Sequence, residues 1–488
     1  MKSFEYYLET ISEIGFVEKL EGSIVTVKGL PNAKPSEVVL FETGEAGQVI
    51  SLGEDSLEVM LFTYSYLSTG VKVARTDQYL EIALGPNLLG KTINPLGHIL
   101  TGKLEVFNQD TRPIDTIPAP ISDRQSIDKS FFTGVSWVDL VIPLGKGQRQ
   151  LVIGDRKIGK TQFLFQALQS GARQGMVCIY AVIGKRSVDI KDAQDFLKKN
   201  NITSQVIVVS SSASDAPGLI YLTPFTAMTI AEYFRDQGRD VLIILDDMIA
   251  HAKYYREISL LARRFPGRSS YPGDIFYVQA RLLERAGNFK TGSITCLPVA
   301  ELTMGDLTGY IPTNLMAITD GHILFDHDYY NQGRRPAINP FLSVTRVGRQ
   351  TQSILMQELN NKLTSFLVQL SKIRQFMHFG AELSEITRNN LILGDKIEKF
   401  LEQLTSEIRP ININLFLLAS FWAGIWKTAP ITSIQPSTQK AFMLYEKDTE
   451  FTQKIDNLIS TSQNLDTLTT AIKTDPELIN SLVGEVNA

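Results

Sequence analysis

The chain has 488 residues, a length that corresponds to roughly three domains. It carries 48 basic and 52 acidic residues, for a net charge of −4 and a pI near 5.9. Nucleic-acid-binding proteins usually present a clearly basic face, so this balance argues against a nucleic-acid partner. The two cysteines, Cys178 and Cys296, stand in apolar runs, which predicts small core residues rather than a disulfide or a metal site.

The sequence predicts neither a signal peptide nor a membrane span. Residues 1–7 lack the apolar run of a secretory signal and the arginine-rich character of a transit peptide. The most apolar stretch, residues 411–426, is too short to cross a bilayer and is interrupted by Asn412 and Asn414. We therefore expect a buried helix there, and contact with a membrane only through partner proteins.

The pattern of residues 20–76 is typical of a small β-barrel that follows a short N-terminal segment, residues 1–19. Glycines and an asparagine separate several short β-rich runs. These runs include residues 24–27, 38–41 and 57–62. Strands at this spacing favour a barrel.

The next segment contains a phosphate-binding loop. An apolar run at residues 150–153 predicts a strand, and residues 162–169 predict a helix. Between them the sequence matches G-x-x-x-x-G-K-[ST] without a mismatch. The loop consists of Gly154, Asp155, Arg156, Lys157, Ile158, Gly159, Lys160 and Thr161. Glycines let backbone N–H groups face phosphate oxygens, lysine adds an ammonium and threonine offers a hydroxyl to Mg²⁺. In this context a chance glycine-rich turn is the weaker interpretation, and we predict a nucleoside triphosphate site.

Two further patterns complete the predicted fold. Buried strands at residues 176–183, 205–209 and 241–245 alternate with helical stretches, which predicts a parallel sheet covered by helices. We assign residues 77–352 to this nucleotide-binding domain. Apolar residues then recur with helical spacing from about residue 356, so residues 353–488 form a predicted helical domain.

Residues 241–246 are an apolar strand that ends in an acid. A carboxylate held at a strand tip beside a phosphate loop can join the Mg²⁺ shell, so Asp246 is the predicted metal residue together with Thr161. The neighbouring Asp247 has two ordinary alternatives, a solvated acid or a helix N-cap.

The water-orienting group of an ATPase is missing from the expected place. The strand at residues 178–183 is followed by Gly184-Lys-Arg-Ser187, and the first acid, Asp189, stands further along. Lys185 and Arg186 can attract phosphate but cannot accept a proton from water. The pattern therefore favours a site that holds a nucleotide over one that splits it quickly. Arg335 and Arg346, taken alone, are most simply explained as surface charges.

Several motifs together resemble the alpha subunit of F-type ATP synthases. They are Gly-Asp-Arg-x-x-Gly-Lys-Thr at 154–161, Arg-Ser-Ser-Tyr-Pro-Gly-Asp at 268–274, Arg-Leu-Leu-Glu-Arg-Ala at 281–286, Tyr-Ile-Pro-Thr-Asn at 310–314, Arg-Pro-Ala-Ile-Asn at 335–339 and Ser-Val-Thr-Arg-Val-Gly at 343–348. The resemblance spans roughly residues 12–425. It implies an N-terminal β-barrel, a RecA-like nucleotide domain and a C-terminal helical domain.

The resemblance also implies a complex and roles within it. Three alpha subunits alternate with three catalytic beta subunits around a central coiled-coil shaft, and alpha subunits bind Mg²⁺ with ATP or ADP without turnover. By motif, Lys160 and Thr161 hold phosphate and Mg²⁺, and Asp246 joins the Mg²⁺ shell. Tyr330 and Arg335 fall near the adenine. Arg346 matches the arginine that acts in trans on the catalytic site of the neighbouring beta subunit.

The chain departs from the family in three places. Lys157 stands where the family usually has glutamine, and the segment at 184–187 lacks the glutamine that usually follows its glycine. The segment before the barrel is several residues shorter than in the family, which leaves docking to a peripheral stalk open. These departures suggest a divergent lineage or a specialised paralogue.

We therefore predict a non-catalytic, regulatory subunit of a rotary proton- or sodium-translocating ATP synthase. It would be peripheral, on the cytoplasmic face of an energy-transducing membrane or on the matrix or stromal face in an organelle. Two alternatives stay open. One is a homohexameric secretion or RNA-translocating ATPase, which would need its own acid after the strand at 178–183. The other is a related subunit recruited to a different motor.

Overall fold

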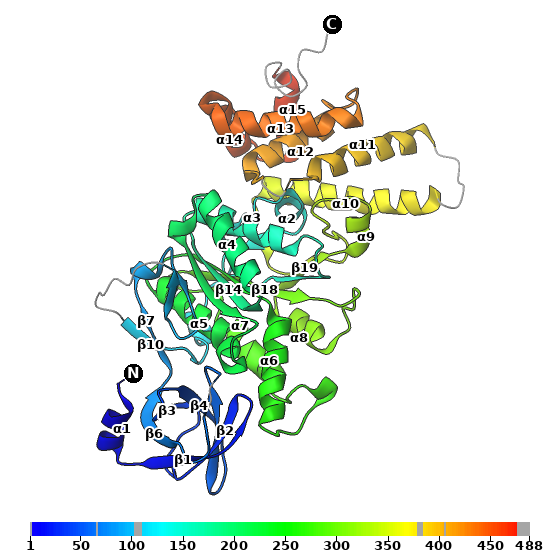
Figure 1. Cartoon of the computed structure of the whole chain (residues 1–488). Coiled ribbons are helices and arrows are strands. Elements are labelled where there is room, and N and C mark those ends of the chain that lie inside the picture. The colour runs from blue at the N-terminus through cyan, green and yellow to red at the C-terminus, as the bar shows by residue number, and fades with distance from the viewer. Residues whose placement is uncertain (1, 65–66, 102–109, 378–383, 405–406, 476–488) are drawn as a thin grey trace. The chain divides into compact units, whose positions relative to one another are not determined.

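The computed structural model describes residues 2–64, 67–101, 110–377, 384–404 and 407–475 (Figure 1). The chain folds into two compact units. Unit 1 comprises Met1–Ser126, Arg149–Val152 and Ala172–Thr319. Unit 2 comprises Ile127–Gln148, Ile153–Gly171 and Asp320–Ala488. The strand β13 (Leu151–Gly154) and the helix α3 (Lys160–Arg173) run from one unit into the other.

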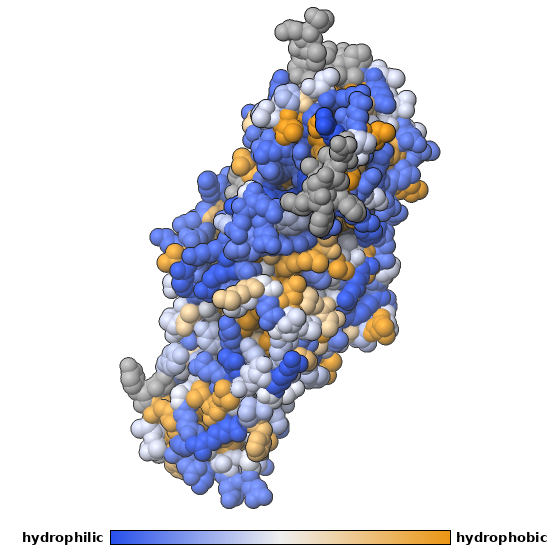
Figure 2. Space-filling model, turned by 90° about the vertical axis from the view of Figure 1, so that its right-hand side faces the viewer, coloured by the Kyte–Doolittle hydropathy of each residue, from blue (hydrophilic) through white to orange (hydrophobic). Residues whose placement is uncertain are grey.

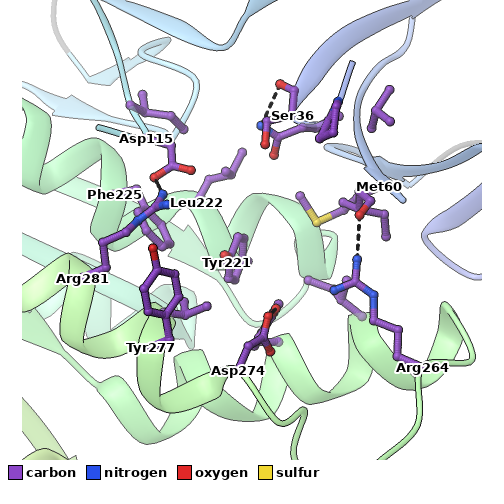
Figure 3. A pocket seen from close by; sticks show the side chains of 18 residues that line it. Ser36, Met60, Asp115, Tyr221, Leu222, Phe225, Arg264, Asp274, Tyr277 and Arg281 are labelled. Carbon is purple, nitrogen blue, oxygen red and sulfur yellow. Dashed lines mark hydrogen bonds and ion pairs between the residues drawn. The ribbon is translucent and has the colours of Figure 1, made fainter. Parts of the chain in front are cut away.

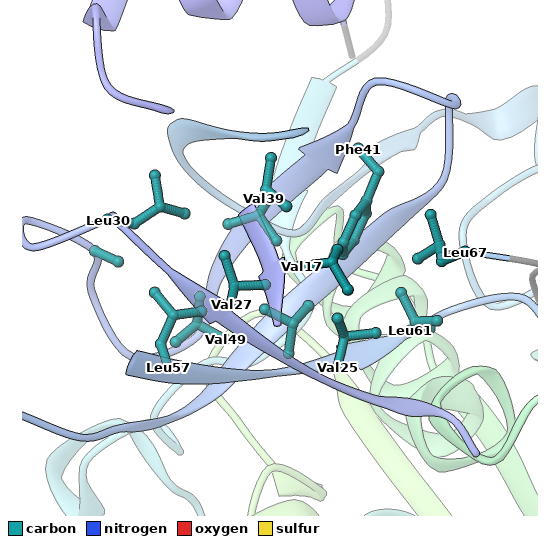
Figure 4. Close-up of a cluster of buried hydrophobic side chains, with 13 residues drawn as sticks. Val17, Val25, Val27, Leu30, Val39, Phe41, Val49, Leu57, Leu61 and Leu67 are labelled. Atoms are coloured by element: carbon teal, nitrogen blue, oxygen red, sulfur yellow. The ribbon is translucent and has the colours of Figure 1, made fainter. Parts of the chain in front are cut away.

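Unit 1 begins with a short helix and a closed six-stranded barrel of order β1-β2-β5-β4-β3-β6. These elements are α1 (Phe4–Ile11), β1 (Ile14–Glu21), β2 (Ile24–Lys28), β3 (Glu37–Phe41), β4 (Ala46–Leu52), β5 (Ser56–Leu61) and β6 (Lys72–Tyr79). All neighbours are antiparallel. Alternate side chains, including Val25, Val27, Val59 and Phe41, fill the interior (Figure 4). The first barrel strand begins at Ile14 and the last ends at Tyr79, so the barrel strands extend beyond the predicted range of 20–76 at both ends.

A buried ion pair ties two barrel strands together. Arg75 of β6 donates from Nε to Glu37 Oε1 at 3.1 Å and from its Nη2 to Glu37 Oε2 at 3.2 Å. Its Nη1 donates to Glu13 at 2.7 Å. Both carboxylates therefore compensate the buried guanidinium, as a charge removed from water requires.

The second part of unit 1 is a mostly parallel sheet. Its strands run in the order β18-β16-β14-β15-β8, with β17 antiparallel to β18 and β9 antiparallel to β8. The strands are β8 (Thr92–Ile93), β9 (Ile99–Thr101), β14 (Val177–Lys185), β15 (Val206–Ser212), β16 (Val241–Asp246), β17 (Gly287–Asn288) and β18 (Ser293–Glu301). A separate ribbon pairs β7 (Glu81–Leu84) with β10 (Asp110–Pro113). Every residue of β16 is buried, as expected for a strand covered on both faces.

Five helices accompany this sheet. They are α4 (Ser187–Lys199), α5 (Pro217–Asp236), α6 (Met248–Leu261), α7 (Ile275–Leu283) and α8 (Tyr310–Ile318). The helix α5 contacts β14, β15 and β16, and it is almost entirely buried. The predicted strands at 176–183, 205–209 and 241–245 are confirmed, and so is the parallel sheet.

Unit 2 contains the phosphate loop and the C-terminal helices. Its strands are β11 (Ser130–Phe131), β12 (Leu144–Gly145), β19 (Gly321–Phe325) and β20 (Val344–Thr345). Its helices include α2 (Ser136–Val141), α9 (His327–Asn331), α10 (Ile354–Met377), α11 (Glu385–Leu401), α12 (Ile411–Ala423), α13 (Ile431–Lys447), α14 (Thr449–Thr461) and α15 (Leu465–Thr474). The helix α12 packs against α10, α11, α13, α14 and α15, which explains its apolar character. The predicted buried helix at 411–426 is therefore confirmed.

These elements confirm the predicted fold class of barrel, nucleotide-domain sheet and helical region; the domain boundaries stay a prediction. Cys178 and Cys296 are buried, and neither forms a disulfide. Within the described residues, no helix combines the length and apolar character needed to cross a membrane. Figure 2 shows polar and apolar side chains interspersed over the face that it draws.

A buried arginine anchors unit 1 and generates a stability prediction. Arg285, 1% exposed, donates to both carboxylate oxygens of Glu232, at 3.0 and 2.6 Å, to Thr229 Oγ1 and to Ile114 O. Arg285→Ala would leave Glu232 without this compensation, so we expect it to lower the unfolding free energy by about 3–5 kcal/mol in urea denaturation. The matched control is Arg281→Ala, whose more exposed pair with Asp115 should contribute less than about 1 kcal/mol. Equal losses in both variants would contradict the prediction.

A buried histidine predicts a loss of stability in acid. His251 lies in α6, fully buried, with its ring stacked on Tyr221 at 5.1 Å. Burial lowers the pKa of His251 to about 4. The unfolded chain would bind a proton near pH 6.5 and the folded chain only near pH 4, so stability falls as pH drops through this window. The difference of about 2.5 between the two pKa values corresponds to about 3 kcal/mol. Urea denaturation of His251→Phe should show a shallower decline from pH 6.5 to 4. An unchanged pH dependence of the unfolding free energy in this variant would contradict the prediction.

Candidate nucleotide-binding site

The phosphate loop starts at the end of β13 and has the backbone shape that its glycines permit. Gly154 and Gly159 have φ values of 156° and 102°, and Lys157 between them has φ 63°. A Cβ at Gly154 would lie 2.6 Å from Phe325 O and 2.8 Å from Phe325 Cβ, at the end of β19. The loop therefore packs directly on β19, and only glycine fits at its first position.

The loop leads directly into α3, whose first residue is Lys160. The side chain of Lys160 is buried, and its ammonium donates to Gly154 O at 2.7 Å and to Asp155 O. Thr161 is exposed on the first helical turn. The ring of Phe163 lies 5.8 Å from that of Phe325, which holds α3 against β19. The helix N-terminus, the ammonium and the hydroxyl are thus placed together at one loop, as phosphate binding requires.

Tyr330 and Arg335 form a stacked pair in unit 2. Tyr330 lies in α9, and Arg335 lies in the turn that follows it. The Arg335 guanidinium lies 3.7 Å from the Tyr330 ring centroid and donates to Tyr330 O at 2.9 Å. The structure thus brings together the two residues predicted near the adenine. A stacked arginine and tyrosine offer a flat surface to a purine.

Residues 342–348 also have a β-like sequence, but the structure forms a strand only at Val344–Thr345 (β20), and Arg346 lies in a bend directly after it. Its backbone N–H donates to Asp320 O at 2.9 Å, and its side chain is exposed. The pKa of His322 is lowered, chiefly by burial and also by the charge of Arg346. The guanidinium is therefore a surface cation near this imidazole.

Asp246 is the predicted site residue that belongs to unit 1. It closes β16 and is 1% exposed. Its Oδ1 accepts from Lys185 Nζ at 2.6 Å, and its Oδ2 accepts from the Tyr180 hydroxyl at 2.7 Å. Asp247 is a buried helix N-cap whose carboxylate accepts from Ala250 N. Burial, together with the charge of Asp246, raises the pKa of Asp247 to about 6.

The end of β14 carries a cation. Burial acts to lower the pKa of Lys185, but the charge and hydrogen bond of Asp246, together with the charges of Asp247 and Glu301, outweigh burial and raise the pKa. Lys185 therefore stays an ammonium at neutral pH. Asp189, the first acid along the chain, accepts from Arg186 at 2.7 and 3.1 Å. This carboxylate is thus already engaged one helical turn beyond the strand.

Sequence reasoning missed three residues of interest. Tyr180 holds Asp246, and Glu301 ends β18, where its charge acts on the pKa of both Lys185 and Asp247. Glu301 could have been predicted from the sequence, because residues 293–301 form an apolar strand that ends in an acid, as residues 241–246 do. Arg334, next to Arg335, contacts residues that are distant in sequence. The sequence also predicts a helix that begins at residues 382–385. Glu382 lies outside the described residues, and α11 starts at Glu385 with Ser384 as its N-cap.

A cavity of about 250 Å³ lies elsewhere in unit 1, between barrel strands and α5, α6 and α7 (Figure 3). Tyr221, Tyr277 and the ion pair between Asp115 and Arg281 lie along its wall. Its lining includes none of the predicted nucleotide residues. This cavity is therefore separate from the candidate site.

Comparison with known families agrees with the geometry. Residues 134–345 match the nucleotide-binding domain of the ATP synthase alpha/beta family, and residues 352–474 match the C-terminal domain of the ATP synthase alpha/beta chain. The two matches together cover most of the chain.

Individual relatives point to one subunit type. "ATP synthase subunit alpha" of Carsonella ruddii is 36% identical over 434 residues, 86% of this chain and 90% of the relative. The protein of the same name from Dictyoglomus turgidum is 38% identical over 87% of this chain and 85% of its own length. "ATP synthase subunit alpha 2" of Syntrophotalea carbinolica is 36% identical over 91% of this chain and 86% of its own length. With the phosphate loop on β19 and the barrel before it, these matches show that the chain belongs to the alpha-subunit family of F-type ATP synthases.

Proposed function

We propose that this chain is the regulatory, non-catalytic subunit of a rotary ATP synthase and that it binds ATP or ADP with Mg²⁺. In this proposal it alternates with a catalytic beta-type subunit in an α3β3 ring around a coiled-coil shaft. It would be peripheral to an energy-transducing membrane, on the cytoplasmic face or its organelle equivalent.

The observation that carries the proposal is the cation at the end of β14. A hydrolytic site needs a carboxylate or amide to orient the attacking water, and this strand tip is where the family arrangement would supply it. There stands Lys185, an ammonium bound to Asp246 at 2.6 Å. A homohexameric ATPase would need an acid at this place, so the residue found favours binding over turnover.

Mg²⁺ fits the chemistry of the two predicted ligands. Thr161 offers an exposed hydroxyl, and Asp246 offers a buried carboxylate at a strand tip. Mg²⁺ is usually held by one or two protein oxygens together with phosphates and water, so a longer list of acids is not required. Each Asp246 oxygen accepts one hydrogen bond from Lys185 or Tyr180 and keeps a lone pair for metal-bound water. The ion would neutralise phosphate charge when bound.

Arg346 is the proposed trans-acting residue. Its guanidinium lies at the surface after β20. A residue that serves a neighbouring subunit must be accessible in this way. A guanidinium placed on a transferring phosphoryl group stabilises the charge of the transition state. Its position within the matched family motif supports the role.

The full-length chain should bind Mg·ATP with almost no hydrolysis. Lys160→Ala should weaken this binding by about tenfold or more, because the buried ammonium at the loop is lost. The assembled complex should keep substantial activity, since the site performs no chemistry. Titration with a fluorescent ATP analogue measures binding, and a phosphate-release assay measures hydrolysis. Replacement of the exposed Lys372 by alanine is the control. Steady hydrolysis by the pure chain, abolished by Lys160→Ala, would instead favour the homohexameric ATPase.

Arg346→Ala in the assembled complex should reduce multisite hydrolysis by about 10³-fold or more, the scale of arginine fingers elsewhere. ATP affinity at the chain's own loop should stay within about twofold, because the arginine serves the partner's site. Lysine should rescue poorly, since it lacks the planar fork of the guanidinium. Arg349→Ala removes another exposed arginine three residues away and is the control. Near-normal turnover by an assembled Arg346→Ala complex would exclude the trans-acting role.

A further inference from the structure

Arg334 lies in the same turn as Arg335, and its side chain contacts the C-terminal helix α11. Its guanidinium lies 4.2 Å from the centroid of the Tyr329 ring and 5.2 Å from that of the Trp137 ring. It also donates to Glu398 Oε1 at 3.0 Å, and both side chains of this ion pair are less than 20% exposed. Two aromatic rings and a carboxylate thus hold one cation from different sides.

The same carboxylate joins two helices. Glu398 lies in α11 and accepts from both terminal nitrogens of Arg374 in α10, at 3.0 Å each. Arg374 also donates to Asp395 at 2.6 Å. The turn at 333–336 is therefore tied through Arg334 to the pair of helices α10 and α11.

Two hydrogen bonds hold the backbone around Arg335, one within the turn and one from Gln403. Arg335 Nη1 donates to Arg334 O at 2.8 Å, and Arg335 O accepts from Gln403 N at 2.9 Å. Gln403 is buried and bonds Ser136 N and Gly134 O, at the start of α2. The stacked pair of Arg335 and Tyr330 is thus connected to a rigid support, and Arg334 provides its one ionic link to α11 among the described residues.

We propose that Arg334 is a positioning residue that sets how much the base contributes to nucleotide affinity at this site. This inference rests on the proposed function, in which Tyr330 and Arg335 face the adenine. Arg334 holds the turn on α11 through Glu398 and so fixes the plane of the stacked pair. It touches no phosphate-loop residue in these contacts, so its effect is confined to the base end of the nucleotide.

A planar cation is required at this position. A guanidinium can stack between Tyr329 and Trp137 while its edge donates to Glu398, whereas an ammonium is a point charge without a stacking face. Replacement of Arg334 releases the turn from α11 while the phosphate loop stays seated on β19. Loss of the base contribution without loss of the phosphate contribution is therefore the signature of this role.

The test compares ATP with inorganic tripolyphosphate, which has the phosphates but no base. Binding of each to the full-length chain is measured by calorimetry for the unmodified chain, Arg334→Gln, Arg334→Lys, Glu398→Gln and Arg374→Gln. We expect Arg334→Gln to weaken ATP binding by about tenfold and to leave tripolyphosphate within about twofold. Arg334→Lys should restore affinity only partly. Arg374→Gln removes a neighbouring arginine but keeps the bond from Arg334 to Glu398, so it should leave both affinities near those of the unmodified chain.

Two results would overturn the inference. One is an Arg334→Gln chain that melts like the unmodified chain and binds ATP equally well. The other is an equal loss for ATP and tripolyphosphate, which would indicate a general structural role. If Arg334→Gln does not fold, Glu398→Gln, which keeps the arginine and its stacking, decides by the same criteria. Failure of the unmodified chain to bind ATP would contradict the proposed function itself. This outcome is distinct from a base contribution that Arg334→Gln leaves unchanged.

Discussion

Close packing of the phosphate loop on β19 is the constraint on which the nucleotide site depends. Gly154 approaches the backbone of Phe325 so closely that a side chain would collide with it, and the Phe325 ring also supports α3 through Phe163. One aromatic residue therefore sets both the start of the loop and the helix that follows. The orientation of the loop amides and of Lys160 follows from this contact, because a loop this short has few other conformations once both ends are fixed.

The second constraint is electrostatic and belongs to unit 1. Asp246 is buried, and a buried carboxylate is tolerated only when it is compensated. Lys185 and Tyr180 provide this compensation without any ligand. The lysine that stabilises the carboxylate also occupies the strand tip where a water-orienting acid would stand. In the proposed function, the residue that stabilises Asp246 is therefore also the one that disfavours turnover.

Local patterns were sufficient to predict much of this structure. Apolar runs identified β14, β15 and β16, and the glycine-rich motif identified the loop, because each signal lies within a few adjacent residues. The strand β1 was missed since Glu18 and Lys19 interrupt its apolar residues, and its partners are β2 and β6. Arg334 was missed for a different reason. Its partner Glu398 lies 64 residues away, and only the tertiary fold brings the two together.

A site that binds a nucleotide without chemistry has different requirements from a catalytic one. Catalysis needs contacts that strengthen in the transition state, whereas retention needs contacts with the ground state. In the proposed function, the contacts around Tyr330 and Arg335 are of the second kind, because they present a flat stacked surface to the base. The turn that carries Arg335 is connected to α10 and α11 through Arg334 and Glu398, so the proposed base subsite shares its support with these two helices.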